Sequence, residues 1–168
     1  MQWVIITLVM LSLLGSLMWI KPTPRQKMQA AMRLHAKQLG FLVQIARIET
    51  TRAKGEMEAE KISVPAYRIL RTDLPPDLRD VWASWQIFRV ENVADAGLPA
   101  GWSWKKGEGT LSLPALTLIR ELIEQVPADV IALESSPVHF TVYWRERGDL
   151  ATLDRLRALI QPILDARI

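Results

Sequence analysis

An uninterrupted apolar stretch at the start of the chain constrains its architecture more than any other feature. Residues 3–20, WVIITLVMLSLLGSLMWI, are eighteen residues without a charged side chain. A helix rises about 1.5 Å per residue, so the stretch would be about 27 Å long, close to the roughly 30 Å apolar layer of a membrane. Trp3 and Trp19 would lie near the two headgroup layers, where indole rings concentrate. The pattern predicts a transmembrane anchor over residues 1–21.

Three other interpretations of the stretch fit less well. A cleaved signal peptide needs a basic segment before the apolar run and small residues at its end, whereas only Met1 and Gln2 precede it and Leu17–Pro22 follow. A lipid-modified anchor needs a cysteine, and the chain has none. A buried core helix is seldom apolar on every face in a domain of this size.

The charges that follow the stretch predict its orientation. Residues 21–48 carry six basic side chains and no acidic one. Basic residues stay on the cytoplasmic side of a span, so we expect the N-terminus outside and the rest of the chain at the cytoplasmic face of the inner membrane. The absence of cysteine agrees with that side. The residues expected at the membrane interface are Trp3, Trp19, Lys21, Arg25, Lys27, Arg33 and Lys37.

Small residues within the anchor offer a place for another helix. Ser12 and Ser16 stand four residues apart with Gly15 beside them. This spacing lets two helices approach closely, so a membrane-protein partner or self-association is one interpretation. A plain lipid-facing anchor is the other.

A basic amphipathic helix is predicted over residues 22–40. Thr23, Pro24 and Gln26 form a capping box with proline at the first helical position, and Gly40 supplies the end. The helix could lie on an anionic leaflet through its basic side chains, or pack on the following domain through an apolar face. That face comprises Met28, Ala31, Met32, His35, Ala36 and Leu39, with Arg33 and Lys37 opposite.

The N-terminal part resembles a known family. A short apolar span, the run Pro24–Lys27, a basic helix and a glycine leading into a strand resemble the small single-pass accessory subunit of the bacterial Sec preprotein translocase. The resemblance covers residues 1–48. It implies a short span with its N-terminus outside and a small β-rich cytoplasmic domain, and a translocase-like assembly as one setting.

Residues 41–168 are expected to form a single α+β domain, a mostly antiparallel sheet with two packed helices. Alternating or β-rich runs predict strands over 41–48, 62–70, 83–91, 130–133 and 138–145. The first should be central, and Pro65 should place the second at an edge or a bulge. Capped apolar stripes predict helices over 112–126 and from Asp149 onward, with Pro162 kinking or shortening the last one near its end.

Side-chain directions and loops complete this prediction. In the strand 138–145, Val138, Phe140, Val142 and Trp144 should face the core, and His139, Thr141, Tyr143 and Arg145 should face away. Glycines and a proline predict a loop over 96–109.

The charge distribution disfavours a nucleic-acid-binding domain. Residues 21–61 hold nine basic and four acidic side chains, whereas residues 62–168 hold twelve and fourteen. A nucleic-acid-binding domain should carry its basic patch on the folded module.

No motif in the sequence predicts catalysis, a metal site or a cofactor. Glu134, Ser135 or Ser136, and His139 could be assembled into a hydrolytic set, but neighbours on a hairpin point in directions set by the sheet. The Gly107–Gly109 turn beside two lysines could touch a phosphate, and a polar loop tip is the simpler interpretation. We infer no small-molecule ligand.

Two tryptophans in the predicted loop are the candidate partner-binding residues. Trp102 and Trp104 stand two apart and precede Lys105 and Lys106. In an extended segment both rings would project to one side, forming an apolar surface of the kind that dominates interfaces. Alternatively, the rings fold back to cover the sheet.

These observations predict a membrane-anchored, non-catalytic accessory or scaffolding subunit of an inner-membrane assembly. The alternative from another class is a membrane-tethered enzyme whose site is assembled only in three dimensions. A deep pocket lined by titratable groups would favour the enzyme, and an exposed apolar patch would favour the scaffold.

Overall fold

The computed structural model describes residues 2–18, 22–53 and 59–168, without the side chains of residues 14 and 16–18. Along the chain, five helices and six strands follow one another in these residues: α1 (Gln2–Met18), α2 (Pro24–Gln38), β1 (Leu42–Glu49), β2 (Lys61–Leu70), α3 (Pro76–Asp80), β3 (Trp85–Phe88), β4 (Ser103–Lys106), α4 (Leu113–Gln125), β5 (Val130–Ser135), β6 (His139–Trp144) and α5 (Leu150–Asp165).

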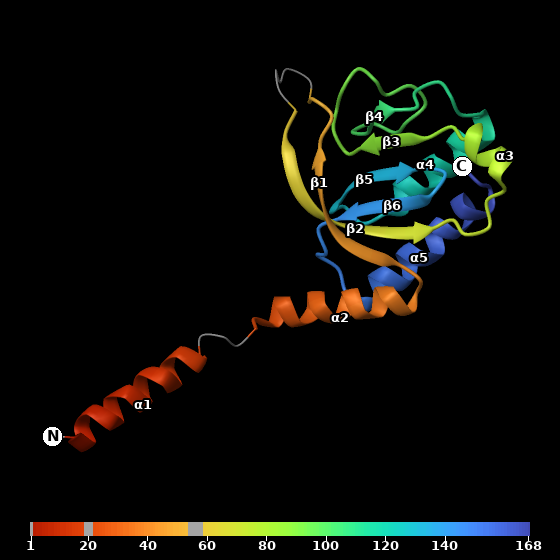
Figure 1. The fold of residues 1–168 in the computed structure, drawn as a ribbon. Coiled ribbons are helices and arrows are strands. Elements are labelled where there is room, and N and C mark those ends of the chain that lie inside the picture. The colour runs from red at the N-terminus through yellow and green to blue at the C-terminus, as the bar shows by residue number, and fades with distance from the viewer. Residues whose placement is uncertain (1, 19–21, 54–58) are drawn as a thin grey trace.

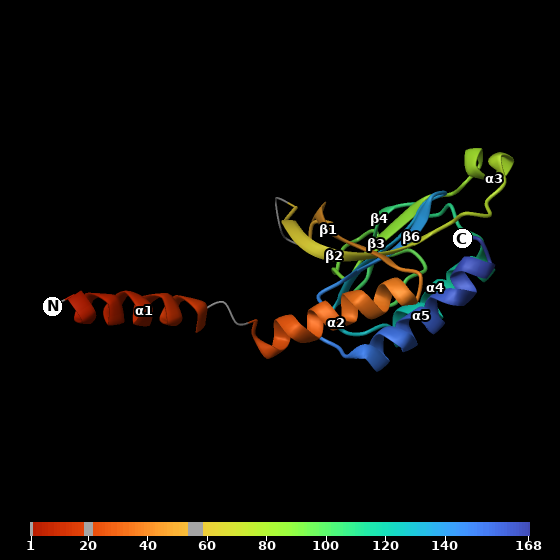
Figure 2. The ribbon, with the colours of Figure 1, turned by 60° about the horizontal axis from the view of Figure 1, so that its bottom comes forward.

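The strands form one antiparallel sheet in the order β1-β2-β6-β5-β3-β4, so β1 and β4 are its edges. Helices α2, α4 and α5 lie along one face of it (Figures 1 and 2). The predicted α+β domain with a mostly antiparallel sheet is confirmed. Three helices cover the sheet rather than two, because α2 also packs on α5 and β1.

The predicted transmembrane anchor is wrong. Helix α1 has 17 residues, one fewer than the apolar stretch from which the span was predicted. Within residues 2–18, 22–53 and 59–168, no helix is both long and apolar enough to cross a membrane. The expected single-pass inner-membrane location and orientation are therefore not supported. Helix α1 lies apart from the sheet in both ribbon views (Figures 1 and 2).

Helix α2 packs on the domain through a narrower face than predicted. Its capping box is confirmed, since the Thr23 hydroxyl accepts from the Gln26 amide and the Gln26 side chain accepts from the Thr23 amide. Met32 and Ala36 are buried, whereas Met28 and Ala31 are exposed. Arg33, expected on the solvent side, reaches back into the domain, because a buried carboxylate there attracts it.

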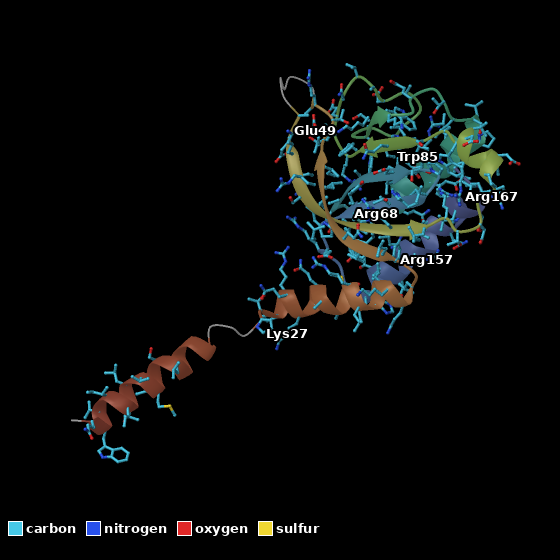
Figure 3. All side chains as sticks on the ribbon, viewed as in Figure 1. Lys27, Glu49, Arg68, Trp85, Arg157 and Arg167 are labelled. Carbon is cyan, nitrogen blue, oxygen red and sulfur yellow. The ribbon has the colours of Figure 1, made fainter. Side chains whose placement is uncertain are left out.

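The main core lies between the sheet and the three helices. Trp85 is fully buried, and its ring meets those of Trp104 and Phe140 edge-on at centroid distances of 6.4 and 5.9 Å. Figure 3 labels Trp85 over the middle of the domain. Tyr67 is also fully buried, with its ring 5.8 Å from Phe41 and 5.4 Å from Trp144. Aromatic pairs in these orientations stabilise a core beyond their buried area.

A smaller apolar cluster occupies the opposite face of the sheet. Val64, Phe88, Ala132 and Tyr143 pack there, because the β1–β2 hairpin bends over that face. Tyr143, expected to face away from the core, is therefore buried in this cluster, and Thr141, expected to face the same way, is also buried. Val138, expected inside, precedes β6 and is 60% exposed.

Other expectations fail for local reasons. The strand near residue 41 is an edge strand rather than a central one, because β2 pairs with it on one side only. The predicted loop over 96–109 contains β4, and the predicted strand over 83–91 is reduced to β3. Strands β3 and β4 pair with each other, with a bulge between Gln86 and Ile87. Pro162 lies inside α5, which ends three residues later at Asp165. The predicted Asp149 cap is confirmed.

Candidate binding site at the opening of the sheet

The pairing between β2 and β6 stops halfway along β2. Residues Ala66–Leu70 pair with β6, whereas Lys61–Pro65 pair only with β1. The next bond in the ladder would run from the amide of residue 65 to the carbonyl of Trp144. Proline has no amide hydrogen, so Pro65 ends the ladder there. Beyond this point β2 curves away from β6 with the hairpin (Figure 1).

The hydrogen bonds of the β1–β2 and β2–β6 ladders show which way each backbone amide and carbonyl of β2 points. Thr50 donates to the Glu60 carbonyl at one end of the β1–β2 register, and Arg71 donates to the Val138 carbonyl at one end of the β2–β6 register. Hydrogen-bonded and non-hydrogen-bonded pairs alternate in antiparallel strands. Even-numbered β2 residues therefore bond to β1, and odd-numbered ones face β6. Lys61 and Ser63 consequently direct their backbone groups into the opening, and the Pro65 carbonyl faces the Trp144 amide at its inner end.

A buried ion pair fixes the other side of the opening. Glu146 follows β6 in a left-handed conformation, with φ of 56°, and its side chain is 1% exposed. Both of its carboxylate oxygens accept from Arg33 at 2.7 Å, and one also accepts from the Tyr67 hydroxyl at 2.8 Å. A non-glycine residue held at positive φ costs about 1–3 kcal/mol and persists only where its surroundings fix it. These three bonds are what holds it.

The ionisation of the groups around Glu146 reflects the same contact. The hydrogen bond to Glu146 raises the pKa of Arg33. Burial, followed by the hydrogen bond to Glu146, raises the pKa of Tyr67. Arg33 is therefore charged and Tyr67 is protonated at neutral pH, which leaves both as donors to the carboxylate.

Because Glu146 turns inward, its two neighbours turn outward. Arg145 and Arg147 are exposed on either side of it. Two backbone hydrogen bonds to Asp129 also fix this segment. The Arg145 amide donates to the Asp129 carbonyl at 3.2 Å, and the Arg147 amide donates to the Asp129 carboxylate at 2.8 Å. The two guanidinium groups therefore project from a fixed turn.

Three adjoining hollows of about 490, 350 and 480 Å³ meet at Arg147 and form one groove, which we call the arginine groove. It runs from the start of α2, past the turn after β6, to the segment before β5. Its charged lining residues are Arg25, Arg33, Arg89, Arg145 and Arg147 against Glu146 and Asp129, and its apolar residues include Ile45, Ile62, Val64 and Ile131.

The five arginines of the groove are not equivalent. Arg33 is paired with Glu146, and Arg89 donates to the carbonyls of Val130 and Pro127 while lying over the Trp102 ring. The described part of the chain contains two ion pairs, Arg33–Glu146 and His35–Asp154, so Arg25, Arg145 and Arg147 take part in neither. These three are the available cations of the site.

This arrangement is suited to binding anions. A guanidinium group presents a planar fork of donors that matches carboxylate and phosphate oxygens. Three such guanidinium groups line the groove: that of Arg25 on α2, and those of Arg145 and Arg147 in the turn after β6.

The predicted partner-binding residues lie elsewhere. Trp102 and Trp104 are each 3% exposed, so their rings belong to the core, as the second interpretation expected. The Trp104 indole donates to the Ala96 carbonyl at 2.9 Å. Lys105 and Lys106 are exposed on β4, where the Lys105 ammonium bonds the Glu49 carbonyl. No exposed indole surface remains for docking at this loop.

The residues predicted to touch a membrane are also dispersed. Trp3 and Ser12 lie on α1, whereas Trp19 and Lys21 and the side chain of Ser16 fall outside the described residues. Lys27 and Lys37 are exposed on α2, where Figure 3 labels Lys27 near the start of the helix. Only Arg25 and Arg33 line the arginine groove.

The hydrolytic set considered from sequence is not brought together. The Ser135 hydroxyl donates to the Ile168 carbonyl, and the Ser136 hydroxyl donates to the His139 carbonyl rather than to its ring. Glu134 accepts from Tyr143 and Gln86, and the His139 ring is 3.0 Å from the Thr141 hydroxyl. Each side chain serves a separate local contact.

Sequence reasoning missed Arg145, Glu146 and Arg147 as a site. The available signal was an alternating Arg-Glu-Arg run at the end of a strand, followed by glycine. Its partners, Arg25 and Arg33, lie more than a hundred residues earlier and were assigned to a membrane surface.

Comparison of the chain with family models, with curated proteins and with solved structures finds no match. The resemblance of residues 1–48 to a translocase subunit therefore stays a prediction.

Proposed function

We propose that this protein is a non-catalytic interaction protein that binds a partner through carboxylate or phosphate groups held in the arginine groove. The observation that carries the proposal is the convergence of three exposed guanidinium groups outside any ion pair, those of Arg25, Arg145 and Arg147. Each charge-assisted hydrogen bond from such a group is about twice as strong as a neutral one.

The shape of the groove supports binding rather than chemistry. Among the described residues, the carboxylates that line it are Glu146, which is fully engaged by Arg33 and Tyr67, and Asp129, which accepts from the Arg147 amide. Neither is poised to take or give a proton at a bound molecule. Among the described residues, no group of three histidines or carboxylates gathers to hold a metal ion.

The test is a binding titration with a defined anionic probe, a fluorescein-labelled hexaglutamate peptide. We expect the full-length protein to bind it and the double variant Arg145→Gln/Arg147→Gln to bind at least about tenfold more weakly, since two charge-assisted bonds are lost. The affinity of the wild type should fall as salt is raised, because exposed charges are screened.

A matched control separates the groove from general surface charge. Arg79→Gln/Arg155→Gln removes the same two charges from exposed positions on α3 and α5. It should change the affinity by less than about twofold, because neither residue lines the groove and exposed charges are screened at ordinary salt. Equal losses in the two double variants would reduce the binding to net charge and contradict the proposed site.

A further inference from the structure

We infer that the ligand of the arginine groove is an extended acidic segment of another protein, which adds as a strand to the free edge of β2 between Lys61 and Pro65. This inference rests on the proposed function and specifies its partner. Two features that line the same hollow support it: the part of β2 that does not pair with β6, and the three arginines outside any ion pair.

The free edge offers donors and acceptors in alternation. Lys61 and Ser63 each direct an amide hydrogen and a carbonyl into the opening, whereas the Pro65 carbonyl faces the Trp144 amide at the last pair of the β2–β6 ladder. Among the described residues, neither Lys61 nor Ser63 pairs with β6, and no backbone bond from outside the sheet reaches them. Strand addition satisfies such a row through the main chain of the ligand.

This chemistry discriminates between classes of ligand. Free phosphate, polyphosphate and carboxylate groups bring acceptors only, so they could satisfy the arginines and the amides but not the carbonyls of Lys61 and Ser63. A peptide backbone brings both donors and acceptors at strand spacing. The edge therefore selects a polypeptide.

The lining argues against a single-stranded nucleic acid. Proteins that bind single strands stack the bases on aromatic side chains. None of the described residues that line the arginine groove is aromatic. Instead, the lining combines arginines with the apolar side chains of Ile45, Ile62 and Ile131.

The same lining specifies the pattern of the ligand. Successive side chains of a strand point to opposite faces. A segment with acidic residues at every second position and apolar residues between them would bring both kinds of side chain to a groove lined by guanidinium groups and isoleucines. Five residues, about 17 Å in extended form, span Lys61–Pro65.

The test uses an acetylated and amidated hexapeptide of three Glu-Val repeats with the full-length protein. Ser63→Pro removes one outward amide, while pairing with β1 is kept because even-numbered residues make it. We expect Ser63→Pro to weaken binding at least about tenfold. The control Ser63→Ala keeps the amide and should stay within about twofold of wild type.

A second measurement does not depend on the variant folding. The same hexapeptide, N-methylated at its valines, has the same charge but fewer donors. We expect wild-type protein to bind it at least about tenfold more weakly than the unmodified peptide. Binding of the unmodified peptide should also slow hydrogen exchange at the Ser63 amide.

Each other outcome has a defined meaning. Equal binding of both peptides, with Arg145→Gln/Arg147→Gln still weakening them, would overturn strand addition and leave the anion-binding function standing. Tighter arginine-dependent binding of inorganic tripolyphosphate or oligothymidylate than of the peptide would also overturn it. Arginine-independent binding of every probe would overturn both proposals.

Discussion

The two halves of β2 differ in their pairing with β6. Ala66–Leu70 pair with β6, Ala66–Arg68 also pair with β1, and Ala66 and Tyr67 are fully buried. Lys61–Pro65 pair on one side, and Ser63 is exposed. One imino acid, Pro65, marks the change. Where β2 pairs with β6, its side chains are part of the core. Where β2 separates from β6, it borders the arginine groove.

The largest expected effect contrasts the two halves directly. Tyr67→Ala removes a buried ring from the continuous half and should lower the free energy of unfolding by about 3–5 kcal/mol. Ser63→Ala, in the open half, should change it by less than about 0.5 kcal/mol. Urea denaturation of both variants measures the difference. Similar losses would mean that the open half is as tightly integrated as the other.

The second prediction concerns the ion pair that closes the groove. Arg33→Ala leaves the Glu146 carboxylate buried without its cation, and should cost about 3 kcal/mol of unfolding free energy. The double variant Arg33→Met/Glu146→Gln removes the buried charge as well and should recover most of that loss. Denaturation of the single and double variants tests this. A double variant as unstable as the single one would show that packing, rather than charge, is responsible.

The local elements were predictable where signals lie within a few residues of one another. The capping box at Thr23 and the Asp149 cap were both visible in sequence and both form. The membrane anchor was not correctly predicted, because apolar composition sets no helix boundary, and α1 covers only Gln2–Met18.

The candidate site was not predictable for a different reason. Arg25 and Arg33 meet Arg145 and Arg147 only because α2 packs beside the turn after β6, a long-range contact without a local pattern. The left-handed backbone conformation of Glu146 could not be predicted either, because glutamate rarely adopts it. Pro65 did carry a signal: a strand with a proline was expected at an edge, and half of β2 is one.

The third prediction restores the missing donor. Pro65→Val supplies an amide opposite the Trp144 carbonyl and should extend the β2–β6 ladder by one bond. The gain of about 0.5–1.5 kcal/mol from that bond is largely offset by about 0.4–1 kcal/mol of restored unfolded-chain entropy. Stability should therefore change by less than about 1 kcal/mol. Amide exchange is the informative measurement, since the new amide at position 65 should be protected. Rapid exchange there would show that the opening is imposed by the hairpin bend rather than by the proline.

The smallest expected effect lies away from the opening, where α2 meets α5. The His35 ring is 2.7 Å from the Asp154 carboxylate, and this hydrogen bond raises the pKa of the imidazole. The unfolded-state pKa is about 6.5, so the stabilisation from this contact is fully present below about pH 6.5 and is lost as the pH rises through the higher folded-state value. His35→Gln should therefore lower the melting temperature slightly at pH 5.5 and leave it unchanged at pH 9. The contact is exposed, so the difference should shrink in high salt, unlike the effect of Arg33→Ala at the buried carboxylate. A pH-independent difference between wild type and variant would assign His35 a packing role, and the contrast between an exposed pair on one side of α2 and a buried pair on the other would disappear.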